Sequence, residues 1–86
     1  MLHFFDVEGI LVRRWVPGQR RVAMESWTGD GWRVFPDIDS VSRHGVRLTR
    51  DEALALLKKI RERSGLTEPL SDGEAETALS SRQRRA

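Results

Sequence analysis

Arginine and tryptophan side chains recur together between residues 13 and 33, and this combination can bind nucleic acid or another protein. Exposed aromatic rings stack on bases while arginines pair with phosphates. Tryptophan and arginine are also enriched at the centres of protein interfaces. If these side chains share an exposed face, we predict an interaction surface made of Arg13, Arg14, Trp15, Arg21, Trp27, Trp32 and Arg33.

The charge balance distinguishes the two kinds of partner. A nucleic-acid-binding domain carries a basic patch or stripe, whereas this chain has 15 Lys and Arg against 13 Asp and Glu, a formal net charge of +2. Glu25 and Asp30 stand among the aromatic residues and would repel phosphate. We therefore expect a non-enzymatic protein-interaction module, and the alternative is a small protein that binds RNA or single-stranded DNA.

A metal site is not predicted. The run that starts at Asp37 begins like a calcium loop, but Ser42 and Leu48 occupy the positions where an EF-hand needs Gly and Glu. We predict instead that the Asp37 carboxylate caps amides of a local turn. Cysteine is absent, and His3 and His44 lie far apart, so the sequence predicts neither a zinc site nor a cofactor.

Enzymatic activity is not expected either. A nucleophile, a base and an acid occur close together as Ser40 or Ser42, His44 and Asp39, but catalytic groups are assembled in space and not by sequence proximity. The chain has no G-x-S-x-G nucleophile elbow and no glycine-rich phosphate loop. A chain of 86 residues is also too short to enclose a deep pocket, so no small-molecule substrate is predicted.

The elements that must position these side chains begin with an antiparallel sheet. Turn signals at Glu8-Gly9, at Pro17-Gly18 and over 28–31 separate four strand-like segments, 4–7, 10–16, 21–27 and 32–35. This pattern predicts a β-meander of three to four strands. Trp27 and Trp32 flank the last turn and can face each other as a cross-strand pair.

A capped amphipathic helix follows the sheet. Thr49 and Glu52 have the spacing of a capping box, and Gly65 suits the position just after a helix. Apolar residues recur with a helical period at Ala53, Leu54, Leu56, Leu57 and Ile60. We predict a helix over 50–64 packed on one face of the sheet, after an irregular polar segment over 37–46.

The predicted organisation is a single α+β domain over 1–66, followed over 67–86 by a linker and a basic end. Within that second stretch we expect either a short helix over about 74–82 or a disordered tail. One helix cannot cover both faces of the sheet, yet apolar residues point to both faces, with Leu11, Trp15 and Phe35 competing with Val12, Met24 and Val34 for one core. This competition favours a homodimer or a protein partner.

The remaining expectations concern location and source. No run approaches the roughly 18 apolar residues of a membrane span, and the first residues lack a basic leader. We expect a cytoplasmic protein with no membrane association. The excess of arginine over lysine is typical of a GC-rich genome and predicts a small bacterial protein.

Overall fold

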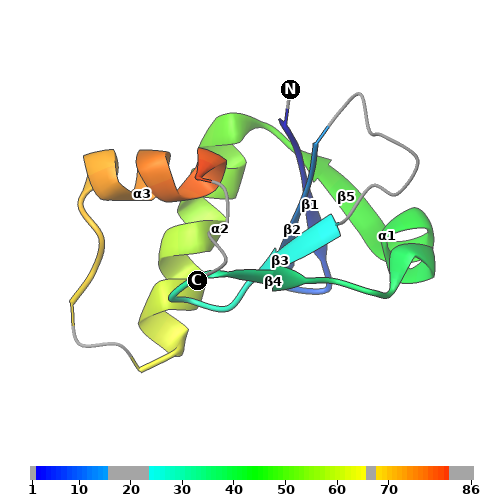
Figure 1. The fold of residues 1–86 in the computed structure, drawn as a ribbon, viewed down its shortest axis with the longest axis horizontal. Helices are drawn as coiled ribbons and strands as arrows, with labels where there is room; N and C mark the ends of the chain where they lie inside the picture. Colours follow the sequence, from blue (N-terminus) through cyan, green and yellow to red (C-terminus); the bar gives the residue numbers. More distant parts are fainter. Residues whose placement is uncertain (1, 16–23, 66–67, 82–86) are drawn as a thin grey trace.

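The computed structural model describes residues 2–15, 24–65 and 68–81 as an α+β fold (Figure 1). In chain order the elements are β1 Leu2–Val7, β2 Ile10–Trp15, β3 Met24–Trp27, β4 Trp32–Val34, α1 Ile38–His44, β5 Gly45–Leu48, α2 Arg50–Arg63 and α3 Asp72–Ser80. The strands form one five-stranded antiparallel sheet in the order β4-β3-β2-β1-β5. The predicted α+β class is confirmed, with one strand more than the predicted three to four.

The meander from β1 to β4 depends on two tight turns that the sequence predicts. Glu8 and Gly9 both have positive φ, of 51° and 90°, and the Asp6 carboxylate accepts from the Gly9 amide at 2.7 Å. The second turn closes when the Thr28 amide donates to the Gly31 carbonyl at 3.0 Å. The predicted Pro17-Gly18 turn lies outside the described residues.

Residues 37–46 are not an irregular segment, and this prediction was wrong. They form α1 and the start of β5, which pairs antiparallel with β1 so that Leu48 lies opposite Phe4. The Asp37 carboxylate accepts from the Ser40 amide at 3.1 Å and so caps α1, which confirms the capping role predicted for Asp37. A helix of seven residues is too short for its apolar period to stand out in the sequence.

The two C-terminal helices begin at capping boxes. Thr49 and Glu52 form both halves of the box at the start of α2, and this helix confirms the prediction for 50–64. Ser71 and Glu74 do the same for α3, which starts two residues before the predicted short helix. None of the described helices is long and apolar enough to cross a membrane.

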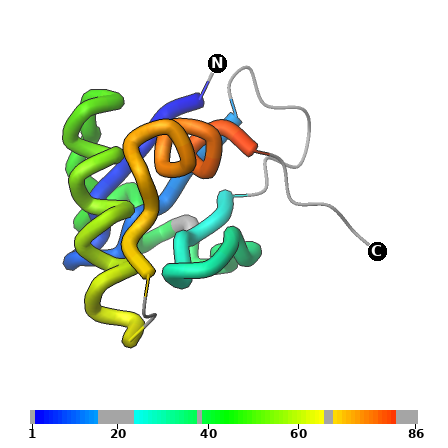
Figure 2. Tube along the Cα trace, turned by 90° about the vertical axis from the view of Figure 1, so that its left-hand side faces the viewer, coloured from blue at the N-terminus to red at the C-terminus, as the bar shows by residue number. Residues whose placement is uncertain are grey.

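Both faces of the sheet carry apolar side chains, and helices lie on both faces. On one face α2 and α3 lie side by side (Figures 1 and 2) over a cluster of buried residues, Phe4, Leu11, Trp27, Trp32, Ala53, Leu57, Ala75 and Leu79. On the other face α1 contributes Val41 to a second cluster with Val7, Val12 and Met24, against which Phe5 and Phe35 pack. The sequence did not predict α1. This helix buries part of the apolar side chains on the second face of the sheet, which the predicted helix alone could not cover.

Candidate functional site

The seven residues of the predicted interaction surface do not gather on one face. Side chains alternate between the faces of a strand, and the register pairs Arg13 with Glu25 and Trp27 with Trp32 on the face under α2 and α3. Trp15 lies on that face as well, two residues beyond Arg13. Arg14 and Arg33 lie on the opposite face, and Arg21 is outside the described residues.

Arg13 is fully buried at the centre of a polar network beneath α3. Its Nε atom lies 2.9 Å from Oε1 of Glu25, and its Nη1 atom donates to the Leu79 carbonyl oxygen at 2.9 Å. The guanidinium carbon lies 4.1 Å from the ring centroid of Trp32 and 5.7 Å from that of Trp15. Such contacts compensate a buried cation by an ion pair, a hydrogen bond and aromatic faces.

Trp32 completes the attachment of α3. Its indole Nε1 atom donates to the Ala78 carbonyl at 2.8 Å, next to the Leu79 carbonyl that Arg13 holds. The last carbonyls of a helix have no partner within the helix, and the last turn of α3 has no basic residue of its own. The Ser81 hydroxyl also donates to Ala78, at 3.2 Å. The sheet therefore adds to the C-terminal cap of α3 from outside the helix.

Trp27 and Trp32 form the predicted cross-strand pair, with ring centroids 5.3 Å apart and planes at 57°. Their exposed fractions are only 6% and 3%. Rings so deeply buried cannot stack on a base or enter a partner's pocket while the fold is intact. Trp15 is half-buried, so the tryptophans serve mainly the core and not the surface.

The opposite sheet face gathers basic side chains that come from four different strands. His3 on β1 lies opposite Arg14 on β2, and Phe5 on β1 lies opposite Arg47 on β5. The guanidinium carbon of Arg47 lies 6.0 Å from the Phe5 ring centroid. By strand alternation the exposed Arg33 of β4 is on this face too. We call the surface formed by His3, Phe5, Arg14, Arg33 and Arg47 the basic sheet face.

Acidic side chains are missing from the strands of this face. In the described part of each strand, the residues that point to this face are His3, Phe5, Val7, Ile10, Val12, Arg14, Met24, Ser26, Arg33, Gly45 and Arg47. No carboxylate of the described residues lies within ion-pair distance of Arg14, Arg33 or Arg47. Burial, followed by the positive charges of Arg47 and Arg14, lowers the pKa of His3 below its ordinary value. The described strands therefore supply no carboxylate that pairs with the arginines of the basic sheet face.

Two acidic residues of α3 form ion pairs with α2, away from the basic sheet face. Among the described pairs, Arg50 lies 2.7 Å from Glu76 and so ties α2 to α3, and Lys58 contacts Asp72 between the same two helices. The near-neutral total charge thus conceals an uneven distribution on the strands, where the carboxylates of Asp6 and Glu25 point to the face opposite the basic sheet face. This uneven distribution is visible only once the strand faces are assigned.

The residues tested for metal binding and catalysis stay apart or pair locally. Over the described ranges no three His, Asp or Glu side chains converge as a metal site would need. The Ser40 hydroxyl donates to the Asp37 carboxylate, and hydrogen bonds from Ser40 lower the pKa of Asp37. His44 Nδ1 faces Glu8 at 3.8 Å, with both side chains exposed, so Ser40 and His44 do not form a nucleophile and base pair.

Two of the residues on the basic sheet face, Arg14 and Arg33, were predicted from the sequence, and three were missed. The alternation of side chains along β1 could have placed His3 and Phe5 on one face, because they stand four and two residues before the buried Val7. Arg47 could not be placed, because β5 was not predicted as a strand. It is β5 that brings this arginine beside the Phe5 ring.

The fold defines a small α+β protein with helices on both faces of a five-stranded antiparallel sheet. No protein-family model, no curated protein and no solved structure matches the chain. Only the chemistry of its own residues therefore bears on its function.

Proposed function

We propose that this protein is a non-enzymatic module that binds single-stranded nucleic acid on the basic sheet face. The observation that supports the proposal most strongly is the set of Arg14, Arg33 and Arg47 on a sheet face whose described strands carry no carboxylate. Arginine matches phosphate geometry with its planar set of donors. Neutralising phosphates releases the counterions that surround a nucleic acid, which is the main source of sequence-independent affinity.

Phe5 supplies a second element of the proposed site. Its ring is half-buried on β1, between β2 and the edge strand β5, with Arg47 beside it. Aromatic rings on an antiparallel sheet, flanked by basic side chains, are a recurrent platform for unstacked bases.

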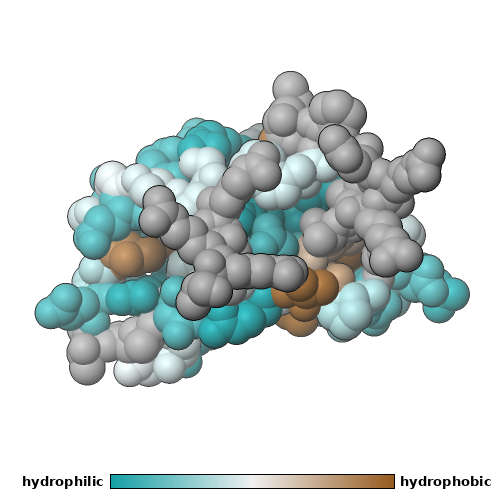
Figure 3. Space-filling view, viewed as in Figure 1, coloured by the Kyte–Doolittle hydropathy of each residue, from teal (hydrophilic) through white to brown (hydrophobic). Residues whose placement is uncertain are grey.

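The protein-interaction hypothesis is supported less well. The largest exposed apolar side chains are Ile10, Val34 and Val46, and the last two belong to β4 and β5, the opposite edges of the sheet. They therefore do not form one contiguous apolar patch of the kind that marks an interface. On the face drawn in Figure 3 the hydrophobic areas are likewise small and separated by hydrophilic side chains. Two copies joined through the basic sheet face would place arginines opposite arginines.

The test is a titration of labelled single-stranded DNA and RNA of about 15 nucleotides, followed by fluorescence anisotropy. Tryptophan quenching is unsuitable because Trp27 and Trp32 are buried. If three arginines contact phosphates, the affinity should fall about 20-fold between roughly 50 and 200 mM salt. The double variant Arg14→Gln/Arg47→Gln should weaken binding at least about 10-fold at the lower salt concentration.

The matched control removes the same charge from an exposed part of α2, with Lys59→Gln/Arg63→Gln. This variant should bind nearly as tightly as the unaltered chain. Equal losses in both double variants, or no binding at low salt, would contradict the proposal. Tighter binding to an acidic peptide than to either nucleic acid would instead identify a protein partner.

A further inference from the structure

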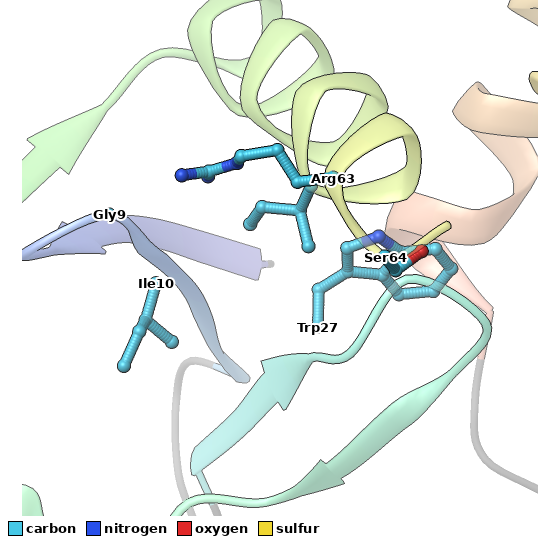
Figure 4. A pocket seen from close by; sticks show the side chains of 6 residues that line it. Gly9, Ile10, Trp27, Arg63 and Ser64 are labelled. Atoms are coloured by element: carbon cyan, nitrogen blue, oxygen red, sulfur yellow. The ribbon is translucent and has the colours of Figure 1, made fainter. Parts of the chain in front are cut away.

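A pocket of about 290 Å³ lies where the β1–β2 turn meets the C-terminal end of α2 (Figure 4). We propose that this pocket binds a small carboxylate with an apolar body, such as a short fatty acid or an aromatic acid. Its lining comes from three separate parts of the chain, as Gly9, Ile10, Trp27, Ile60, Arg63 and Ser64. Ile10 points to the same side of the sheet as the basic sheet face, but none of His3, Phe5, Arg14, Arg33 and Arg47 lines the pocket, so the inference is independent of the proposed function.

The first observation is a buried hydrogen-bond donor without an acceptor. Trp27 is 6% exposed, and its Nε1 atom has no hydrogen-bond partner among the described residues. Its neighbour Trp32 uses the equivalent atom to hold the Ala78 carbonyl. In Figure 4 the nitrogen of Trp27 lies on the ring edge turned toward α2, the helix that supplies the Ile60, Arg63 and Ser64 walls of the pocket. A buried N–H group is normally paired, so this donor favours a ligand with an acceptor atom.

The second observation is a cation on another wall of the same pocket. Arg63 is exposed at the end of α2, and no described carboxylate lies within ion-pair distance of it. Figure 4 shows its side chain extending toward the Gly9 side of the pocket. A guanidinium can hold both oxygens of a carboxylate. Together the Arg63 guanidinium and the Trp27 indole N–H group provide donors for an anionic acceptor.

The negative end of α2 at this pocket is the feature that opposes an anion. Its last carbonyls are already occupied, however. The Ser64 amide donates to Ile60 at 2.9 Å and the Gly65 amide donates to Glu62 at 3.3 Å. The Ser64 hydroxyl donates to the Arg61 carbonyl at 2.7 Å. These bonds reduce the negative potential that the helix end presents to the ligand.

The remaining walls determine the size and polarity of the ligand. Ile10, Ile60 and the indole ring are apolar, so the ligand needs an apolar body. An added Cβ at Gly9 would meet no atom within 4 Å, which leaves the turn side of the pocket open. A volume of about 290 Å³ is at the small end of ligand pockets, and this restricts the ligand to a small molecule.

The experiment follows the three indole N–H signals by nuclear magnetic resonance while benzoate or hexanoate is added at millimolar concentration. The signal of Trp27 should shift and saturate, whereas that of Trp32, already bonded to Ala78, should stay in place. Benzylamine should give no shift, because it carries a cation and not an acceptor. No shift of the Trp27 signal with either acid, or an equal shift with benzylamine, would overturn the proposal.

Two variants then test whether the charge of Arg63 contributes to binding. Arg63→Gln should raise the dissociation constant of benzoate at least fivefold, while Lys59→Gln, the loss of an exposed cation on the same helix, should leave it unchanged. An unchanged Trp32 signal verifies in each variant that the fold is intact. If benzamide binds as tightly as benzoate, or if both variants weaken binding equally, the assignment to carboxylates is wrong.

Discussion

The guanidinium of Arg13 on β2 donates to the carbonyl oxygen of Leu79 in α3 across 2.9 Å, and both residues are fully buried. The two residues are 66 positions apart in the chain. Glu25 balances the charge from the neighbouring strand at 2.9 Å. A side chain that looks like part of a binding surface in the sequence is therefore the polar centre of the fold.

Replacing Arg13 by Met should destabilise the protein by about 3 kcal/mol, because removal of one member of a buried ion pair leaves the other charge uncompensated. The free energy of unfolding in urea measures this loss. Arg14→Met is the matched control, since Arg14 is the adjacent residue on the opposite face and is only half-buried. It should change the free energy by less than about 1 kcal/mol. Similar losses in the two variants would refute the central role of Arg13.

Trp32→Phe should loosen α3 more than Trp27→Phe does. Of these two tryptophans only Trp32 donates a hydrogen bond to α3, through the Ala78 carbonyl at 2.8 Å. Its loss leaves that carbonyl with only the Ser81 hydroxyl at 3.2 Å, at a cost of about 1 kcal/mol. Hydrogen exchange of the α3 amides is the measurement. Exchange should accelerate selectively in α3 for Trp32→Phe and should change little there for Trp27→Phe. The same exchange pattern in both variants would count against a specific cap.

Gly29→Ala should cost more stability than Gly9→Ala. Both glycines have positive φ, of 107° and 90°, so alanine is strained by about 1–2 kcal/mol at either position. At Gly29 the added Cβ would also lie 2.6 Å from the Ser64 hydroxyl oxygen and 2.8 Å from its Cβ, whereas at Gly9 it meets open space. In thermal unfolding, Gly29→Ala should therefore have a lower midpoint temperature than Gly9→Ala.

The clash between a Cβ at position 29 and Ser64 can be tested with a second, compensating substitution. Ser64→Gly removes the two atoms that the new Cβ at position 29 would meet. The double variant Gly29→Ala/Ser64→Gly should therefore lose less than the sum of its two single variants, which a double-mutant cycle measures. Strict additivity would show that contact with Ser64 does not explain the loss.

The pH dependence of stability should contain a contribution from His3. Burial and the charges of Arg47 and Arg14 lower its pKa below the ordinary value of 6.5. The unfolded chain therefore takes up a proton at a higher pH than the folded chain does. The free energy of unfolding should fall as the pH drops from about 6.5 toward the lowered pKa. In His3→Gln this decrease should be smaller, whereas His44→Gln should retain it.

The affinity of the basic sheet face for nucleic acid should depend on pH in the opposite direction to the stability of the fold. A phosphate placed between Arg14 and Arg47 would raise the pKa of His3, so the complex takes up a proton. The affinity for single-stranded DNA should then increase as the pH falls from about 7.5 to 5.5. Titrations of His3→Gln should show a smaller increase. An affinity that is independent of pH in the unaltered chain would place the phosphate away from His3.

Local sequence signals account for the parts of the fold that the sequence predicted. The Glu8-Gly9 turn and the capping box of Thr49 and Glu52 each involve residues within a few positions of one another, so their chemistry is visible in the sequence. The helix α1 and the strand β5 carry no comparable signal. The pairing of β5 with β1 depends on where α1 directs the chain, which is a property of the assembled fold.

The candidate site was harder to predict for a related reason. Arg13 and Arg14 are adjacent and chemically identical, but β2 sends one into the core and the other to the surface. Composition cannot distinguish them, and the strand register does. The same register brings His3 and Arg47 near Arg14 from residues that are distant in sequence.

The external capping of α3 has a consequence for the order in which the chain folds. A helix of nine residues has little stability in isolation, and the groups that fix its end belong to β2 and β4. The sheet has to be in place before these groups can receive α3. We therefore expect α3 to dock last during folding and during synthesis, when β1–β5 and α2 have already left the ribosome. Until then the cation of Arg13 lacks the Leu79 carbonyl, which makes the arrival of α3 the step that completes the core.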